Sequence, residues 1–243
     1  MSHLRALWRA LRALAHVLRG LWIIRTEFGR LTPDACALLV REWSRRMLDI
    51  MGVSLSVEGE RPQRGPLLLL ANHISWLDIL VLNAAYPVRF VSKADVRHWP
   101  VLGALITGAG TILIERERRR DAMRVVHHMA EHLQAGEVVA VFPEGTTGDG
   151  ITLLPFHANL LQAAIVSNAP ALPVGLRYLD GASGARSDAP QYVGDTTLLA
   201  SVWRTLRADG LRAVVRYGQP VHSDGRERRA WAAALREAVA RLL

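Results

Sequence analysis

The chain has 243 residues, of which 50% are apolar and 21% are charged, and its formal net charge is +8. This balance excludes a disordered chain and is typical of a globular protein large enough to bury a core. The single cysteine, Cys36, excludes a disulfide framework, and the 30 basic residues, all but one arginine, favour a polyanionic partner: nucleic acid, an anionic membrane face or phosphorylated small molecules.

Residues 3–24 predict an amphipathic helix. Basic side chains recur every three or four residues and so form one stripe, made of Arg5, Arg9, Arg12, His16 and Arg19. The neighbouring face is apolar and carries Leu4, Leu7, Trp8, Leu11, Leu14, Leu18 and Trp22. This pattern favours a helix lying in a membrane interface with its guanidinium groups among lipid phosphates. The alternative is a helix packed on its own domain or on a second subunit.

A second helix is predicted to follow Thr32-Pro33-Asp34 and to run to about Ile50, before Gly52. The arginines near the N-terminus interrupt the apolar core that a signal peptide would need, and no run is typical of a transmembrane helix. We therefore expect a peripheral or monotopic protein.

After Gly52 short apolar runs alternate with helical patterns. The predicted strands are 53–58, 66–71, 88–92, 110–114, 137–142, 171–177 and 212–217. The predicted helices are 75–85, 118–134, 157–167, 197–208 and 226–242. Strands separated by helices indicate an α/β fold with a largely parallel mixed sheet flanked by helices. We expect residues 1–51 to form a membrane-associating helix pair and residues 52–243 an α/β domain, together one catalytic unit.

Polar motifs follow three of the predicted strands. Asn72-His73 comes after the second strand, Glu115-Arg116 after the fourth, and Pro143 to Thr146 after the fifth. In open α/β sheets ligands bind in the crevice outside the carboxyl ends of the strands. The sequence therefore predicts a site at that edge of the sheet.

His73 and Asp78 could act there as a base and its orienting group. If His73 lies in the turn before a helix and Asp78 in its first turn, the carboxylate can accept from one ring nitrogen and leave the other as the base. The chain has no G-x-S-x-G motif, so the hydroxyl to be deprotonated would come from the substrate. The alternative is that Ser75-x-x-Asp78 is a capping box and Asp78 merely begins a helix. No second histidine or carboxylate lies nearby at the spacing of a metal site.

Other segments allow two interpretations each. Gly145 would let backbone approach a ligand, beside the hydroxyls of Thr146 and Thr147, although Gly148-Asp149-Gly150 alone would be an ordinary turn. Residues 98–110 combine apolar and small side chains, which suits either an apolar ligand groove or plain core.

Cations flank these segments. Arg116 is placed to meet an anion at the sheet edge, and Lys93 and Arg97 either contact phosphate or are surface charges.

Taken together, four motifs resemble those of the glycerolipid acyltransferase family that includes 1-acyl-sn-glycerol-3-phosphate acyltransferases. Asn72-His73 through Asp78 is similar to its N-H-x4-D motif, and GTILIER, residues 110–116, to its second motif. F-P-E-G-T is present at 142–146, and the proline-centred strand of the family resembles residues 171–174. The resemblance covers about residues 50–180, and the N-terminal helices are similar to the membrane-binding element of such enzymes.

The resemblance implies an O-acyltransferase of phospholipid biosynthesis. His73 would take the proton from the acceptor hydroxyl, which attacks the thioester of acyl-CoA or acyl carrier protein, while Asp78 orients His73. The residues implied to hold the glycerol-phosphate part of the acceptor are Arg116, Glu144, Gly145 and Thr146. We expect the acceptor to be 1-acyl-sn-glycerol-3-phosphate, giving phosphatidic acid. No cofactor or metal is expected because a thioester is already activated, and the expected location is the cytoplasmic face of the inner membrane, which is anionic.

Two departures from the family pattern leave the acceptor open. Thr147 and Gly148 stand where many members have arginine and serine, and Leu113 replaces the usual phenylalanine. F-P-E-G-T-T looks more like enzymes acting on lyso-ornithine lipids or lysophosphatidylcholine. Two other functions compete: a hydrolase using water with the same His–Asp pair, and a non-catalytic membrane-surface or nucleic-acid-binding protein. The arginines cluster on helices without a nucleic-acid motif, so we expect no nucleic-acid partner.

Overall fold

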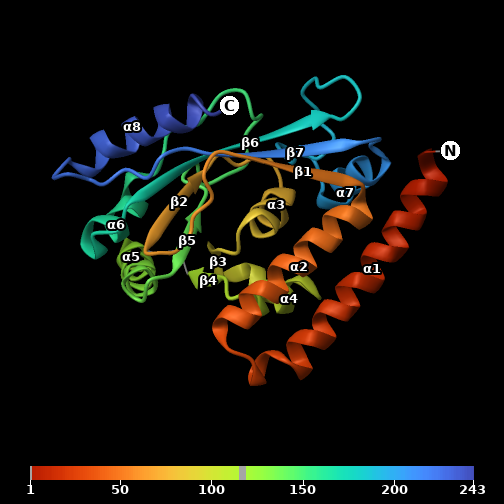
Figure 1. Ribbon diagram of the computed structural model, residues 1–243, viewed down its shortest axis with the longest axis horizontal. Helices are drawn as coiled ribbons and strands as arrows, with labels where there is room; N and C mark the ends of the chain where they lie inside the picture. The colour runs from red at the N-terminus through yellow and green to blue at the C-terminus, as the bar shows by residue number, and fades with distance from the viewer. Residues whose placement is uncertain (1, 115–118) are drawn as a thin grey trace.

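The computed structural model describes residues 2–114 and 119–243, and within them helices and strands alternate as the sequence predicts (Figure 1). The strands are β1 Val53–Glu58, β2 Leu67–Ala71, β3 Arg89–Lys93, β4 Ile112–Ile114, β5 Val138–Val141, β6 Ala171–Asp180 and β7 Leu211–Tyr217. The α-helices are α1 Ser2–Thr26, α2 Pro33–Met51, α3 Leu77–Ala85, α4 Leu102–Gly108, α5 Arg119–Gln134, α6 Leu161–Ser167, α7 Leu198–Arg207 and α8 Arg228–Ala240. Short 3-10 helices lie at η1 Phe28–Arg30, η2 Ala94–His98 and η3 Ala158–Leu160.

The strands form one sheet in the order β1-β7-β6-β2-β5-β3-β4. Neighbouring strands are parallel except for the antiparallel pair β6–β7, so the predicted largely parallel mixed sheet is confirmed. Every residue of the central strand β2 is buried. Its uninterrupted leucine run follows from this position, because a central parallel strand is covered on both faces.

Helices cover both faces of the sheet. One apolar core joins the sheet to α5, α6 and α8, and the other joins it to α2, α3 and α7. In Figure 1, α8 lies above β6 and β2 while α3 and α2 lie below the sheet, with α1 outermost. Because β2 and β5 are parallel neighbours, the turns that follow them lie together at the carboxyl edge of the sheet.

Helix α1 is attached to the rest of the molecule through its polar stripe, which corrects one expectation from the sequence. Arg5 forms an ion pair with Asp209 at 3.0 Å, and Arg9 donates to the carbonyls of Leu206 and Ala208 at 2.9 and 2.8 Å. These carbonyls lie at the end of α7, where a helix lacks internal donors and favours positive charge. These two guanidinium groups therefore bind protein rather than lipid phosphates.

His16, in the same stripe, is also turned inward. Its ring stacks on Trp43 of α2 with ring centroids 4.9 Å apart, and its Nε2 lies 2.9 Å from the Trp43 carbonyl oxygen. Trp43 Nε1 in turn donates to the His16 carbonyl at 3.1 Å. This reciprocal pair of hydrogen bonds joins α1 to α2.

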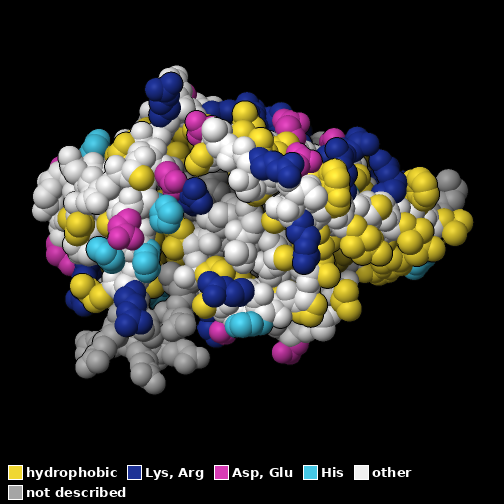
Figure 2. Space-filling view, turned by 90° about the horizontal axis from the view of Figure 1, so that it is seen from below, with side chains coloured by type: hydrophobic (Ala, Val, Ile, Leu, Met, Phe, Trp, Pro, Cys, Tyr) yellow, Lys and Arg dark blue, Asp and Glu magenta, His cyan; other side chains and the backbone are white. Residues whose placement is uncertain are grey.

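The apolar face of α1 is left outside. Leu4 and Trp8 are 77% and 61% exposed, and Leu7, Leu11, Leu14, Leu18 and Trp22 are exposed as well. Figure 2 shows hydrophobic side chains gathered over the end of the molecule that α1 forms, with basic side chains beside them. A patch of this kind on a protein surface marks an interaction site. Among the described residues, no helix has the length and hydropathy needed to traverse a bilayer.

Candidate active site

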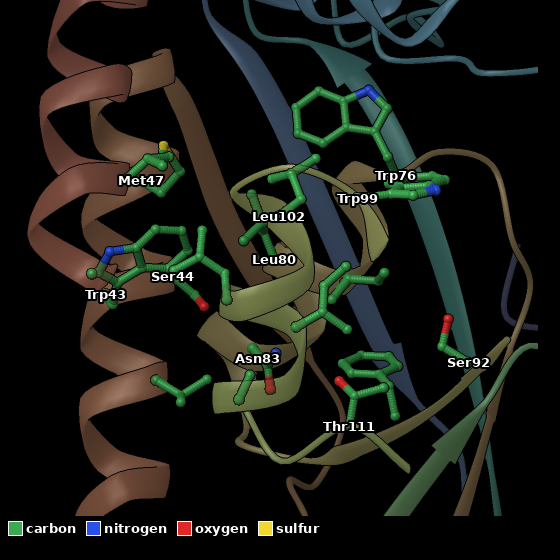
Figure 3. A pocket seen from close by; sticks show the side chains of 18 of the residues that line it. Trp43, Ser44, Met47, Trp76, Leu80, Asn83, Ser92, Trp99, Leu102 and Thr111 are labelled. Atoms are coloured by element: carbon green, nitrogen blue, oxygen red, sulfur yellow. The ribbon is translucent and has the colours of Figure 1, made fainter. Parts of the chain in front are cut away.

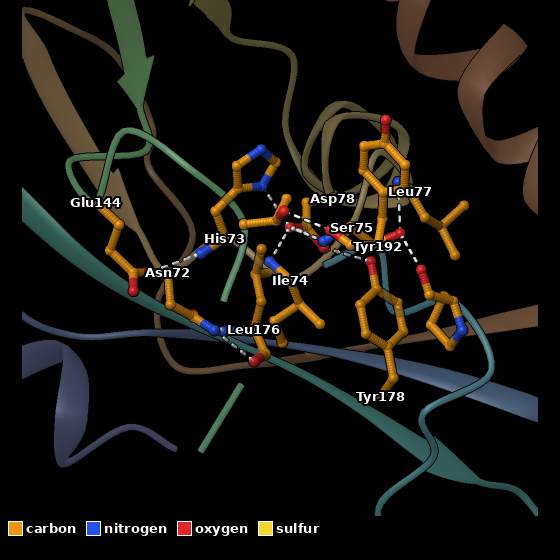
Figure 4. A network of polar contacts seen from close by, with 12 residues as sticks. Asn72, His73, Ile74, Ser75, Leu77, Asp78, Glu144, Leu176, Tyr178 and Tyr192 are labelled. Atoms are coloured by element: carbon orange, nitrogen blue, oxygen red, sulfur yellow. Dashed lines mark hydrogen bonds and ion pairs between the residues drawn. The ribbon is translucent and has the colours of Figure 1, made fainter. Parts of the chain in front are cut away.

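The site begins where β2 ends, with Asn72 and His73 directly after Ala71 (Figure 4). The Asn72 side chain extends the pairing of β2 with β6, because its Nδ2 donates to the Leu176 carbonyl at 3.1 Å and its Oδ1 accepts from the Leu176 amide at 2.7 Å. Asn72 is 1% exposed. It therefore fixes the turn that carries His73 and does not face a ligand.

His73 and Asp78 form the pair that the sequence predicts. His73 lies in the turn before α3, Asp78 lies in the first turn of that helix, and His73 Nδ1 is 2.8 Å from Asp78 Oδ2. A carboxylate accepts only, so Nδ1 carries the proton and Nε2 is free to act as a base. The His73 side chain remains 19% exposed while Asp78 is fully buried. The imidazole is thus fixed through Nδ1 by a buried carboxylate, while the side chain stays partly accessible to a substrate.

The buried Asp78 carboxylate is itself held by several donors. Its Oδ2 accepts from the amides of Ile74 and Ser75 at 2.7 and 2.9 Å, and its Oδ1 accepts from the Tyr178 hydroxyl at 2.6 Å. The hydrogen bond from the Ser75 amide is half of a capping box. Asp78 therefore both caps α3 and orients His73, so the two interpretations from the sequence are compatible. Burial and the neighbouring carboxylate raise the pKa of Tyr178 well above its ordinary value, which keeps its hydroxyl a donor.

Tyr178 was missed from the sequence, although a signal exists. The side chains of Leu172, Val174, Leu176 and Tyr178 share one face of β6, as expected for a period of two along a strand. A tyrosine continuing an otherwise buried apolar face needs a polar partner for its hydroxyl. That partner is Asp78.

Glu144 links the turn after β5 to the turn after β2. Its Oε1 accepts from the His73 amide at 2.9 Å and its Oε2 accepts from the Leu154 amide at 2.8 Å. The residue is 5% exposed. Burial raises its pKa, although the hydrogen bonds from the two amides act in the opposite direction. In this arrangement the carboxylate positions His73, and its implied contact with the acceptor stays a prediction.

Phe142 forms one wall of the site. Its ring stacks on the His73 imidazole with centroids 3.9 Å apart and an interplanar angle of 8°. Together with the Asp78 bond, this stacking restricts the imidazole to one orientation. Phe142 entered the sequence analysis only as part of F-P-E-G-T, without a role of its own.

The turn after Phe142 supplies an open surface beside His73. Gly145 adopts the left-handed conformation with φ of +73°, and both Gly145 and Thr146 are exposed. The Thr147 hydroxyl donates to the Tyr192 carbonyl, and the Gly148 amide donates to the His73 carbonyl at 2.7 Å. The two motifs are therefore tied together by backbone bonds. Of the residues expected to hold the acceptor, Arg116 lies outside the described residues.

An apolar cavity of about 550 Å³ opens beside His73. Figure 3 shows Trp43, Ser44 and Met47 of α2 facing Leu80 and Asn83 of α3 across this space. Residues 98–110 contribute to the wall through Trp99, Leu102, Leu105, Ile106 and Ala109. The groove interpretation of that segment is thus supported over plain core.

Metal-binding side chains are not grouped in the part of the chain that the structure describes. Over residues 2–114 and 119–243, no three histidine, cysteine, aspartate or glutamate residues are arranged to hold a metal ion.

Comparisons with known proteins agree on one family. A family model described as Acyltransferase matches residues 54–177. The chain is 40% identical to a 1-acyl-sn-glycerol-3-phosphate acyltransferase of Neisseria meningitidis over 71% of this chain and 67% of the relative. It is 37% identical to a lyso-ornithine lipid O-acyltransferase of Pseudomonas aeruginosa over 98% of this chain and 93% of the relative.

The fold also matches a solved structure. The crystal structure of the 1-acyl-sn-glycerophosphate acyltransferase PlsC from Thermotoga maritima superimposes with a TM-score of 0.72 and 18% identity, covering 99% of this chain and 94% of that one. At that identity the similarity concerns the fold alone.

Proposed function

Because this chain belongs to the acyltransferase family and is an O-acyltransferase, we propose that it transfers a fatty acyl group from an acyl thioester to the free hydroxyl of a lysolipid. The observation that carries the proposal is the His73–Asp78 pair, whose imidazole lines an apolar cavity. The pair can activate a hydroxyl, and the cavity can accept a hydrocarbon chain.

His73 is the proposed general base. Its Nε2 takes the proton of the acceptor hydroxyl as the oxygen attacks the thioester carbonyl, which contributes on the order of 10²–10⁴ in rate. When the tetrahedral intermediate collapses, the carbon–sulfur bond breaks and the leaving thiolate receives that proton from His73. Acyl-CoA and acyl carrier protein both present such a thioester.

Asp78 is proposed to orient the base and to stabilise the imidazolium formed during the reaction. It is buried, held by two backbone amides and Tyr178, and bonded to Nδ1 rather than to the reacting nitrogen. This is the role of the carboxylate in a Ser-His-Asp triad, with the substrate hydroxyl in place of the serine.

The fatty acyl chain is proposed to occupy the cavity between α2, α3 and α4. A volume of about 550 Å³ suits a small-molecule site, and the lining is mostly apolar. Each CH₂ group removed from water contributes about 0.8 kcal/mol. The acyl chain would thereby supply binding energy that holds the thioester beside His73.

The acceptor is proposed to lie on the turn after β5, against Gly145 and Thr146, with Arg116 and Glu144 as the further predicted contacts. The first candidate is 1-acyl-sn-glycerol-3-phosphate, which would give phosphatidic acid. A lyso-ornithine lipid is the second, and two observations favour it: the relative of that name aligns over 98% of the chain, and Thr147 follows F-P-E-G-T.

The exposed face of α1 is proposed to lie in the surface of an anionic membrane at the cytoplasmic side, where lysolipid acceptors reside. Its leucines and tryptophans would enter the interface, while Arg19, exposed beside them, would meet lipid phosphates. Because Arg9 and His16 hold α1 on the protein, membrane binding would place the site at a fixed distance from the lipid.

The direct test is an incubation of purified protein with a labelled acyl thioester and a panel of lysolipids. Separate reactions supply acyl-CoA and acyl carrier protein as donor. Labelled product with two acyl chains is expected, and its headgroup identifies the acceptor. Release of free fatty acid alone would instead identify a hydrolase and overturn the proposal.

A further inference from the structure

The segment that follows the turn after β5, where the acceptor is proposed to lie, carries a histidine that none of the four motifs includes. His157 immediately precedes η3, and its amide donates to the Pro143 carbonyl at 2.8 Å. This bond returns the chain to the turn formed by Pro143 to Thr146. His157 is therefore fixed next to that turn, although it stands twelve residues after Gly145 in the sequence.

The imidazole of His157 lies directly over Gly145. A Cβ atom added to Gly145 would come within 2.8 Å of His157 Nε2 and 2.9 Å of His157 Cδ2. The absence of a side chain at Gly145 is thus what admits the ring. Gly145 lines the same cavity as His73, so the His157 ring contacts a residue of the cavity wall.

The His157 ring is available to a ligand. The residue is exposed, and its ring nitrogens make no hydrogen bond or ion pair with any residue of 2–114 or 119–243. Neighbouring groups are already occupied: Glu144 accepts from two amides, the Thr147 hydroxyl donates to Tyr192, and Arg236 donates to Leu153 and Leu154. An imidazole, by contrast, offers N–H donors to a phosphate or carboxylate oxygen.

We propose that His157 binds the anionic group of the lysolipid headgroup and so determines which acceptors the enzyme selects. The inference rests on the proposed function and adds a residue and a role to it. The bound group is an oxyanion, either the phosphate of a lysophosphatidate or the carboxylate of a lyso-ornithine lipid. His157 contacts the headgroup, whereas His73 contacts the reacting hydroxyl.

The test measures acceptor KM, donor KM and kcat for the parent and for His157→Ala, His157→Gln and His157→Lys, with each of the two lysolipids. A hydrogen bond to a charged group implies that the alanine variant raises acceptor KM at least about 10-fold, with donor KM and kcat within about twofold. Lysine should restore parental acceptor KM, because it supplies a cationic donor, and glutamine should restore it only in part. The lysolipid that responds identifies the phosphate or the carboxylate as the bound group.

His222→Ala, which removes an exposed histidine from another loop, is the matched control and should leave all three constants unchanged. An unchanged acceptor KM in His157→Ala, an equal rise in donor KM, or equal effects of all three substitutions would overturn the inference while acyl transfer by the parent upholds the proposed function. A parent that transfers no acyl group would overturn both. Should the alanine variant fail to fold, the comparison of lysine with glutamine decides, and equal acceptor KM in those two counts against the role.

Discussion

The Tyr178 hydroxyl donates a 2.6 Å hydrogen bond to Asp78 Oδ1, and both residues are buried. The other oxygen of the same carboxylate, Oδ2, accepts a hydrogen bond from His73 Nδ1. Strand β6 thereby supports the orientation of an imidazole carried by the turn after β2. A buried carboxylate that loses one of its donors keeps its desolvation penalty, so this contact affects both stability and activity.

Replacing Tyr178 with phenylalanine should lower stability by ~1–3 kcal/mol, the cost of leaving a buried acceptor unsatisfied. We expect kcat to fall about 10-fold, which is less than the 10²–10⁴-fold loss expected for removal of the base itself. Chemical denaturation and steady-state acyl transfer measure the two effects. Tyr192→Phe is the control, because the hydroxyl of Tyr192 bonds to nothing in the described ranges, and equal behaviour of the two variants would contradict the role of Tyr178.

Ala109→Leu should shift the donor preference toward shorter acyl chains. Ala109 lines the cavity at the end of α4, so a larger side chain there reduces the space for hydrocarbon. Each CH₂ group displaced from the cavity should lower kcat/KM by about fourfold, which corresponds to about 0.8 kcal/mol. Competition among acyl thioesters of graded length measures the shift. Ala182→Leu, on an exposed turn, is the control, and an unchanged length profile in Ala109→Leu would place the acyl chain elsewhere.

Regular elements were predicted well because their patterns are local. Strand 53–58 has the expected bounds, and the other predicted strands and helices end within four residues of expectation, several of them at the expected residue. Short apolar segments were harder, because a run without clear periodicity does not distinguish strand, helix and loop. The seven-residue helix α4 was accordingly not predicted, and the short 3-10 helix η2, whose residues are mostly polar or charged, was not predicted either.

Contacts between distant segments were the other limit. The spacing of His73 and Asp78 predicts their pairing, since the turn that carries His73 leads directly into the first turn of α3, which carries Asp78. The reach of Tyr178 depends on how β6 is placed beside β2, and the contact of His157 with Gly145 depends on how the chain returns after β5. The sequence does not show that the arginine stripe of α1 faces the protein, because its hydrogen-bond partners lie at the end of α7, far along the chain. None of these relationships follows from local periodicity.

Replacing Leu11 and Leu18 together with serine should weaken binding to anionic vesicles without unfolding the protein. Both leucines are more than half exposed, so the substitutions remove apolar area that would enter the membrane interface rather than the core. Burial of a leucine side chain contributes about 1.5–3 kcal/mol, so we expect vesicle affinity to fall at least about 10-fold. Val166→Ser, on α6 at the other face of the sheet, is the control in co-sedimentation. Undiminished co-sedimentation of the double variant would exclude this face of α1 as the membrane contact.

Acidification should weaken the attachment of α1 through His16. Burial lowers the pKa of His16 below its ordinary value of 6.5, and Arg19 and Arg46 act in the same direction, while the hydrogen bond with Trp43 acts against them. The folded protein therefore binds fewer protons than the unfolded chain, so this contribution to stability is present above pH 6.5 and is lost as the pH falls through the lowered pKa.

Thermal unfolding followed between pH 7.5 and 5, conditions chosen around the ordinary pKa of histidine of about 6.5, measures this effect. His16→Gln keeps a donor for the Trp43 carbonyl but does not titrate. We expect the melting temperature of the parent to fall more steeply than that of the variant on acidification. Parallel curves would show that His16 does not couple proton binding to folding.

The measurement that tests the mechanism most directly is the rate of acyl transfer by His73→Ala under single-turnover conditions, with labelled acyl thioester and the lysolipid that the parent accepts. We expect the fold to be retained, since the His73 side chain is partly exposed and the Asp78 carboxylate keeps its backbone donors and Tyr178. The rate should fall by about 10²–10⁴-fold while the variant still binds the thioester. A folded His73→Ala protein that forms product at a rate close to that of the parent would contradict the assignment of the base.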